Sequence, residues 1–169
     1  MNDMERRLQA VETRLAIIEL EGAYARAFDD HDGDTWSSLF TEDGIYQARI
    51  LEDARPGSYV RGRSNLRDYC NQAPYNGIHY MHLPQITIDG QTATSRIHLE
   101  FYGSFPGSGA LRLKMAGYYD VSYAQVDGEW RIARRVTTTF SQEGTEFFGY
   151  VPGNGLDSPH GSETGTSTS

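Results

Sequence analysis

The residues of this chain that could do chemistry gather in one short stretch, FDDHDGDTW, and in a few scattered histidines. Residues 28–36 contain four aspartates and a histidine, namely Asp29, Asp30, His31, Asp32 and Asp34. Such a cluster could bind a metal ion, supply one catalytic carboxylate, or form a solvated turn. These three uses need different spacings and surroundings, so the neighbouring residues can separate them.

A metal site is the first possibility, and the spacing argues against it. An EF-hand loop needs acidic ligands at positions 1, 3 and 5, glycine at 6 and glutamate at 12. If Gly33 is position 6, then position 1 is Phe28 and position 12 is Leu39, so two ligands are missing. His79 and His82 are three residues apart, a spacing that places side chains on opposite faces of a strand, and further zinc ligands are missing. The sequence predicts neither a bound metal nor a cofactor.

Asp29 differs from the other aspartates because of the helix expected before it. Apolar or small residues recur at steps of three and four, the period of one helical face. They are Leu8, Val11, Leu15, Ile18, Gly22 and Ala25. The next step of four reaches Asp29, which predicts that this carboxylate lies on the buried face. Burial and the helix dipole both penalise its charge there, so we expect a histidine partner.

The other members of the cluster are explained by local structure. Asp34 is placed to cap a short helix expected over 35–40, and Asp32 to form the turn before it. Asp30 and His31 are expected to form a solvated loop. Among the remaining histidines, His79 begins the first long strand and His98 lies on a polar strand face, whereas His160 is in the tail.

The remaining sequence predicts an α+β fold in one domain spanning 1–157. A strand is expected at 45–50 and a third helix near 64–70. From residue 78 the apolar period changes to two, and Asp89–Gly90 and Asp127–Gly128 are placed as hairpin turns, because both central positions need φ > 0. Helices followed by long antiparallel strands indicate helices packed on one face of a curved sheet. Residues 158–169 are rich in Ser, Thr and Gly and are expected to be a disordered tail.

Composition limits the partners and the compartment. A net charge of −8 argues against nucleic acid and anionic membranes. The N-terminus is charged and periodic rather than a signal peptide, and the longest apolar runs are too short to span a bilayer. One cysteine, Cys70, allows no intramolecular disulfide and is compatible with a reducing compartment. We therefore expect a cytoplasmic protein, and its 11 tyrosines and 7 phenylalanines would suit the wall of an apolar cavity.

Three segments resemble the SnoaL-like branch of the NTF2-like superfamily. They are AIIELEGAYARAFDDHDGDTWSSLFTEDGIY (16–46), IHYMHLPQITIDGQTATSR (78–96) and AGYYDVSYAQVDGEWRIARRV (116–136). Within the branch the chain is most similar to scytalone dehydratase, bile acid 7α-dehydratase and hexachlorocyclohexane dehydrochlorinase. The resemblance implies a cone-shaped fold, in which a curved antiparallel sheet wraps around helices and encloses an apolar pocket. It also implies a homo-oligomer, either a dimer or a trimer.

The resemblance also implies site residues. Asp29 and His79 match a His–Asp dyad, Tyr24 matches a tyrosine of the bile-acid enzyme, and Arg135 matches an arginine of the dehydrochlorinase. Tyr46 approximates a second catalytic tyrosine, whereas Phe101 stands where the bile-acid enzyme has another aspartate.

The predicted function is a cofactor-independent lyase that acts on an apolar, oxygenated ring compound. His79 is the expected base, Asp29 its orienting partner, and Tyr24, or else Tyr46 or His98, the proton donor. Expected wall residues of the substrate pocket are Trp36, Phe40, Tyr46, Phe101, Tyr118, Phe140 and Phe147. The alternatives are a ring isomerase or cyclase, a non-catalytic assembly subunit like that of ring-hydroxylating dioxygenases, and an epoxide hydrolase using Asp120 with Arg135.

Overall fold

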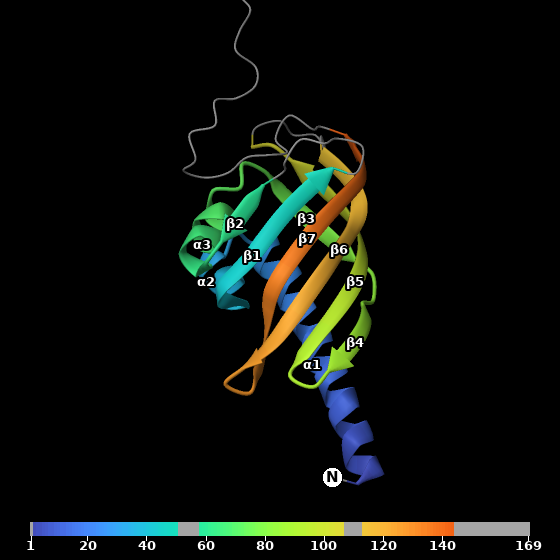
Figure 1. Ribbon diagram of the computed structural model, residues 1–169. Coiled ribbons are helices and arrows are strands. Elements are labelled where there is room, and N and C mark those ends of the chain that lie inside the picture. The colour runs from blue at the N-terminus through green and yellow to red at the C-terminus, as the bar shows by residue number, and fades with distance from the viewer. Residues whose placement is uncertain (1, 51–57, 107–112, 144–169) are drawn as a thin grey trace, which may run out of the picture.

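The computed structural model describes residues 2–50, 58–106 and 113–143 (Figure 1). Its elements are α1 (Asp3–Asp29), α2 (Gly33–Ser38), β1 (Phe40–Ile50), β2 (Tyr59–Arg61), α3 (Arg63–Asn71), β3 (Asn76–Met81), β4 (Gln85–Asp89), β5 (Thr92–Ser104), β6 (Leu113–Val126) and β7 (Glu129–Glu143). The predicted tail at 158–169 and Phe147 lie outside the described residues, as does the side chain of Phe140.

The strands form one curved sheet around the C-terminal half of α1, with α2 and α3 at one side (Figure 1). The strand order is β2-β1-β7-β6-β5-β3, and β4 pairs with β5. The predicted α+β class and curved sheet are confirmed. The sheet is not entirely antiparallel, however, because β1 and β7 run parallel. These two strands are separated by most of the chain, so no hairpin fixes their relative direction.

The two predicted hairpins are present, with one shift in the turn. Asp127 and Gly128 both have positive φ, 52° and 84°, as expected for the tight turn between β6 and β7. In the other hairpin Asp89 still pairs with Thr92, so the turn residues are Gly90 and the residue after it. Gly90 alone supplies a positive φ there, of 57°.

Helix α1 buries a different face from the predicted one. It begins with a capping box between Asn2 and Glu5. Its buried apolar side chains are Ile17, Leu20, Tyr24, Ala27 and Phe28. The stripe expected to be buried is exposed instead, with more than half of Leu8, Val11 and Leu15 open to solvent (56%, 53% and 55%). The prediction was wrong because α1 has two apolar faces, and its N-terminal half extends beyond the sheet (Figure 1).

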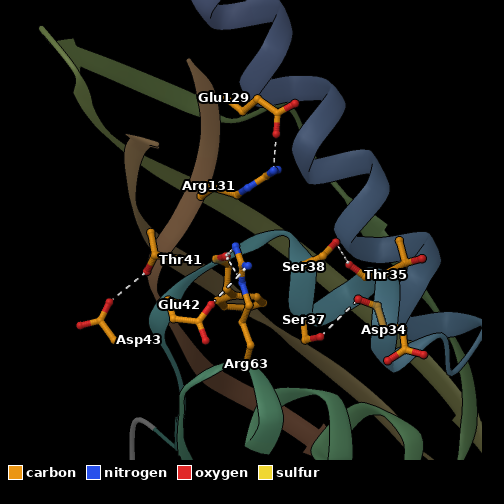
Figure 2. A network of polar contacts seen from close by, with 11 residues as sticks. Asp34, Thr35, Ser37, Ser38, Thr41, Glu42, Asp43, Arg63, Glu129 and Arg131 are labelled. Atoms are coloured by element: carbon orange, nitrogen blue, oxygen red, sulfur yellow. Dashed lines mark hydrogen bonds and ion pairs between the residues drawn. The ribbon is translucent and has the colours of Figure 1, made fainter. Parts of the chain in front are cut away.

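The acidic cluster mainly builds the connection from α1 to α2. Asp32, rather than Asp34, caps α2, since its Oδ1 accepts a hydrogen bond from the Thr35 backbone N–H at 3.0 Å. The Asp34 carbonyl accepts one from the Ser37 hydroxyl at 3.2 Å inside the helix (Figure 2). His31 is not solvated as predicted. It is half-buried, and its ring nitrogens lie 3.3 Å from the Cys70 carbonyl and 3.2 Å from Asn76 Oδ1.

Arg63 connects helix α3 to the start of β1 through hydrogen bonds and an ion pair. Nε and Nη2 of Arg63 donate to the Phe40 carbonyl at 3.0 and 2.7 Å. Arg63 also forms an ion pair with Glu42 at 3.4 Å (Figure 2). These contacts hold β1, which carries Tyr46, against the helical side of the molecule.

Candidate active site

The end of α1 and the edge strand β3 bring Asp29 and His79 together. The Asp29 carboxylate accepts two hydrogen bonds from His79, one from the backbone N–H at 2.9 Å and one from Nδ1 at 2.6 Å. An ionised carboxylate can only accept, so Nδ1 carries a proton. In a neutral ring Nε2 is then the basic nitrogen, and it has no hydrogen-bond partner within the described part of the chain.

Local structure explains why these two side chains meet. Along β3, Ile78 and Tyr80 are exposed at 55% and 57%, so the alternation turns His79 inward. Beyond Asp29 the chain reverses at His31, whose φ of 55° is left-handed. Asp29 therefore reaches β3 because the helix ends beside that strand, and not because it continues a buried stripe. Its side chain is 17% exposed and that of His79 is 6% exposed.

His79 forms part of the wall of an aromatic pocket. The non-atom space in the pocket is about 550 Å³, its open mouth included. The lining residues are Tyr24, Phe28, Tyr46, Ala48, Ser58, Tyr69, Tyr75, His79, Phe101, Leu113, Met115 and Tyr119. Mostly apolar walls with a few convergent polar groups are typical of small-molecule sites. The space is narrow between these side chains, so a ring-sized molecule requires some of them to move.

Tyrosine hydroxyls supply polar groups in this wall. Tyr24 and Tyr119 are hydrogen-bonded to each other. Tyr46 accepts a hydrogen bond from the Thr137 hydroxyl at 3.2 Å and is also bonded to Tyr69. Burial raises the pKa of Tyr24 well above its usual value, although the nearby Arg135 acts in the opposite direction. These phenols therefore remain protonated at neutral pH and can donate hydrogen bonds.

Arg135 lies behind the pocket rather than in its wall. The side chain is fully buried and forms an ion pair with Glu21 of α1. Its guanidinium carbon lies 3.6 Å from the ring centre of Tyr24 and 4.4 Å from that of Tyr119. Burial lowers the pKa of Arg135, but the Glu21 carboxylate more than offsets this, and the net direction is upward. Arg135, which the resemblance implied as a site residue, therefore does not line the pocket, because Tyr24 and Tyr119 cover it.

Glu21 is the centre of a buried polar network that the sequence analysis missed. Besides binding Arg135, its carboxylate accepts a hydrogen bond from the Tyr123 hydroxyl at 2.6 Å. That hydroxyl is also 2.6 Å from Ser95 Oγ. The alternation along β6 could have indicated this orientation, because Tyr123 and Tyr119 share the inward parity of Val121.

Five other predicted site residues lie outside the pocket. His98 and Tyr118 are on the outer face of the sheet, with ring centres 6.2 Å apart. Strand parity explains this, since the neighbouring Phe101 and Tyr119 are the inward residues. Trp36 and Phe40 are fully buried and pack behind the pocket wall. Asp120 also lies on the outer face, where it pairs with Arg96 and not with Arg135.

Phe101 does line the pocket, and a glycine makes room for it. Its ring centre lies 4.7 Å from that of His79. The ring passes under Gly77, where a Cβ atom would collide with it and with the Tyr102 carbonyl. A glycine at position 77 is therefore required for Phe101 to lie beside the histidine.

Two further findings concern the described residues as a whole. No group of three or more His, Cys, Asp or Glu side chains among them is arranged to hold a metal ion. None of their helices is both long enough and apolar enough to cross a membrane.

A curved sheet wrapped on one long helix, with an internal pocket, defines the class of cone-shaped α+β proteins. This chain belongs to the SnoaL-like domain family, whose model matches residues 9–136. The SnoaL-like family predicted from the sequence is thereby confirmed.

Comparisons with individual proteins agree with this assignment. The chain is 28% identical over 136 residues to the uncharacterized protein Rv2910c of Mycobacterium tuberculosis, covering 79% of this chain and 89% of that protein. It shares its fold with a candidate scytalone dehydratase from Novosphingobium aromaticivorans (TM-score 0.69, 18% identity, 88% of this chain and 97% of the other).

Two further solved structures have the same fold. One is the hexachlorocyclohexane dehydrochlorinase LinA Type2 (TM-score 0.70, 15% identity, 88% of this chain and 99% of the other). The other is the beta subunit of a candidate aromatic-ring-hydroxylating dioxygenase from N. aromaticivorans (TM-score 0.68, 22% identity, 78% and 92%). At these identities the likeness establishes the fold alone.

Proposed function

We propose that this protein is a cofactor-independent lyase that eliminates an oxygen leaving group from an apolar ring compound. One observation carries the proposal. Asp29 binds both the backbone N–H and Nδ1 of His79, which leaves Nε2 for a molecule in the aromatic pocket. A histidine held in one tautomer by a carboxylate is a suitable general base near neutral pH.

The elimination uses His79 first. Nε2 takes a proton from a carbon atom activated by a neighbouring carbonyl group, and the C–H electron pair forms the new C=C bond. The C–O bond to the leaving group then breaks, and its electron pair leaves with the oxygen. Asp29 stabilises the imidazolium that forms and keeps the ring oriented.

A tyrosine completes the proton balance. Tyr24 donates its hydroxyl proton to the departing oxygen, which leaves as water or an alcohol. Its ring lies edge-on to His79 with 6.3 Å between ring centres, and its hydroxyl is bonded to that of Tyr119. Exchange with solvent then returns the imidazolium and the tyrosinate to their starting states.

The pocket favours a substrate with flat apolar rings and few oxygen substituents. Phe101 and Tyr75 offer aromatic faces beside His79, with 5.5 Å between their ring centres. The only basic nitrogen in the wall is that of His79, so an anionic substrate has no cationic partner among the described lining residues.

The test uses a fused bicyclic ketone with a hydroxyl group on the β-carbon. Elimination gives a conjugated enone, which is followed by its ultraviolet absorption. The same ketone without the hydroxyl group is incubated in D₂O, and loss of the α-proton is followed by NMR. We expect both reactions with the wild-type protein and neither with His79→Gln.

The alternatives predict different results in the same two assays. α-Proton exchange without elimination would overturn the lyase proposal in favour of a ring isomerase or cyclase, because the base would act but no oxygen would leave. Tight binding with neither reaction would favour a non-catalytic binding subunit. Activity that survives in His79→Gln would exclude the dyad.

A further inference from the structure

A regular stripe of exposed apolar side chains runs along α1, outside the pocket. Its large side chains are Met4, Leu8, Val11, Leu15 and Ile18, and each is more than one third exposed. They lie on the side of the helix opposite to the face that packs on the sheet. The N-terminal half of α1 also extends free of the body of the molecule (Figure 1). A helix that carries five exposed apolar residues on one side needs a partner for that side.

The spacing of the stripe is that of a coiled coil. Alternating steps of four and three place Leu8 and Leu15 at the a positions of a heptad and Met4, Val11 and Ile18 at the d positions. The pattern continues through Gly22, where a Cβ would meet nothing within 4 Å. The buried residues Thr13 and Leu20 fall at f positions, so the body of each subunit lies on the outside of such a seam.

The charges beside the stripe select a parallel arrangement. Arg7 falls at a g position and Glu12 at the next e position. In parallel coiled coils these positions face each other between chains, whereas in antiparallel ones g faces g and e faces e. Arg14 and Glu19 repeat the pattern one heptad later. Arg14 also donates to the Ile86 carbonyl of its own subunit at 3.0 Å, so Arg7 and Glu12 are the more informative pair.

The types of residue in the seam indicate the number of chains. Leucine at a with β-branched residues at d favours three or four strands over two. Here the two a positions within the stripe are Leu8 and Leu15, and the d positions Val11 and Ile18 are β-branched. We propose that three or four copies of this chain associate through a parallel, in-register bundle of their α1 helices along the Met4–Ile18 stripe.

The first experiment measures the mass of the full chain by sedimentation equilibrium at micromolar concentration. We expect three or four subunits for the wild type and one subunit for Leu8→Glu/Leu15→Glu. Both leucines are exposed in the single subunit, so circular dichroism should be unchanged. The matched control, Gln9→Glu/Ala10→Glu, adds the same charge away from the seam and should keep the wild-type mass. A wild-type mass of one or two subunits would overturn the proposal, as would an assembly that survives the leucine substitutions.

The second experiment tests the direction of the helices. Arg7→Glu places two acidic side chains opposite each other and should raise the concentration of half-dissociation by about tenfold. Arg7→Glu/Glu12→Arg restores opposite charges and should return it to within about threefold of the wild type. Failure of the double variant to recover would exclude the parallel arrangement.

A cross-linking experiment checks the register independently. Leu8→Cys places thiols of neighbouring chains on facing positions only if the helices are parallel and in register, so oxidation should join subunits in pairs. Ala10→Cys lies away from the seam and should not cross-link. The native Cys70 is buried and does not interfere. Equal cross-linking of both variants would contradict the proposed seam.

Discussion

Two carboxylates of α1, Asp29 and Glu21, bind basic side chains of the sheet, about two turns apart. Asp29 holds His79 at the pocket and is partly open to solvent. Glu21 holds Arg135 in the core, where neither side chain reaches the pocket. The first pair leaves a basic nitrogen free for chemistry, whereas the second is covered by Tyr24 and Tyr119. Proximity of an acid and a base therefore does not identify a site. A basic nitrogen that has no hydrogen-bond partner and faces a cavity is the better indication of a site.

The largest effect is expected on activity, when Asp29 of the first pair is replaced. Asp29→Asn removes the acceptor that orients His79, so kcat in the elimination assay should fall by about 10²–10⁴-fold. Asp30→Asn, at the adjacent exposed position, serves as the control and should retain wild-type kcat. Equal activity of Asp29→Asn and Asp30→Asn would remove Asp29 from the proposed mechanism.

The second pair, Glu21 and Arg135, is expected to affect stability instead. Glu21→Gln leaves the Arg135 charge buried without its counter-ion, which should lower the free energy of unfolding by about 3–5 kcal/mol. Urea denaturation measures the loss, with Glu19→Gln on the exposed side of the same helix as the control. A difference of less than about 1 kcal/mol between the two variants would contradict a structural role for the Glu21–Arg135 pair.

Alkaline pH should lower the stability of the folded protein, because several tyrosines of the pocket wall are buried. Burial raises the pKa values of Tyr24, Tyr69 and Tyr119 above the ordinary 10.0. Above pH 10 the unfolded chain releases these protons while the folded chain keeps them, so stability falls as pH rises. Each tyrosine contributes about 1.4 kcal/mol per pH unit. Tyrosinate absorption should show a gradual phase from exposed tyrosines such as Tyr59 and Tyr80, followed by one cooperative step in which the buried tyrosines ionise as the protein unfolds. Gradual titration of the buried tyrosines without unfolding would contradict their raised pKa values.

A smaller effect on activity is expected at Tyr24, whose ring contacts both Arg135 and His79. Tyr24→Phe keeps the ring that stacks on Arg135 but removes the proposed proton donor. We expect kcat to fall by roughly 10–100-fold, with KM little changed, because the neighbouring Tyr119 hydroxyl remains. Tyr80→Phe, at an exposed position of β3, is the control. A rise in KM with kcat unchanged would assign Tyr24 to binding rather than to proton transfer.

The smallest effect is expected at His98, a histidine of the sheet that has no carboxylate partner among the described residues and does not line the aromatic pocket. It faces outward beside Tyr118. His98→Ala should change the free energy of unfolding by less than about 0.5 kcal/mol and leave kcat within about twofold of the wild type. A large loss of kcat would mean that the outer face of the sheet takes part in the reaction.

Part of this structure could be predicted from the sequence, because it depends on local patterns. Strand periodicity and turn residues identified both hairpins. The carboxylate of Asp29, whose charge is unfavourable at the end of a helix, identified the need for a partner such as His79. The buried face of α1 could not be identified in the same way. Its outer stripe, including Leu8 and Leu15, has the more regular spacing, whereas the true inner face contains Glu21 and Tyr24. Which face is covered depends on where the sheet lies, and that is fixed by contacts distant in sequence.

The space that Gly77 leaves for Phe101 has a consequence for engineering. The ring of Phe101 fills the volume that the missing Cβ of residue 77 leaves beside His79. A side chain at 77 would also collide with the Tyr102 carbonyl, a backbone group that no substitution at 101 removes, so a library that varies position 77 would sample mostly collisions. Position 101, in contrast, can be made smaller while glycine is kept at 77, which leaves space beside His79 for a bulkier ligand. Phe101 is therefore a natural starting point for directed evolution toward larger substrates.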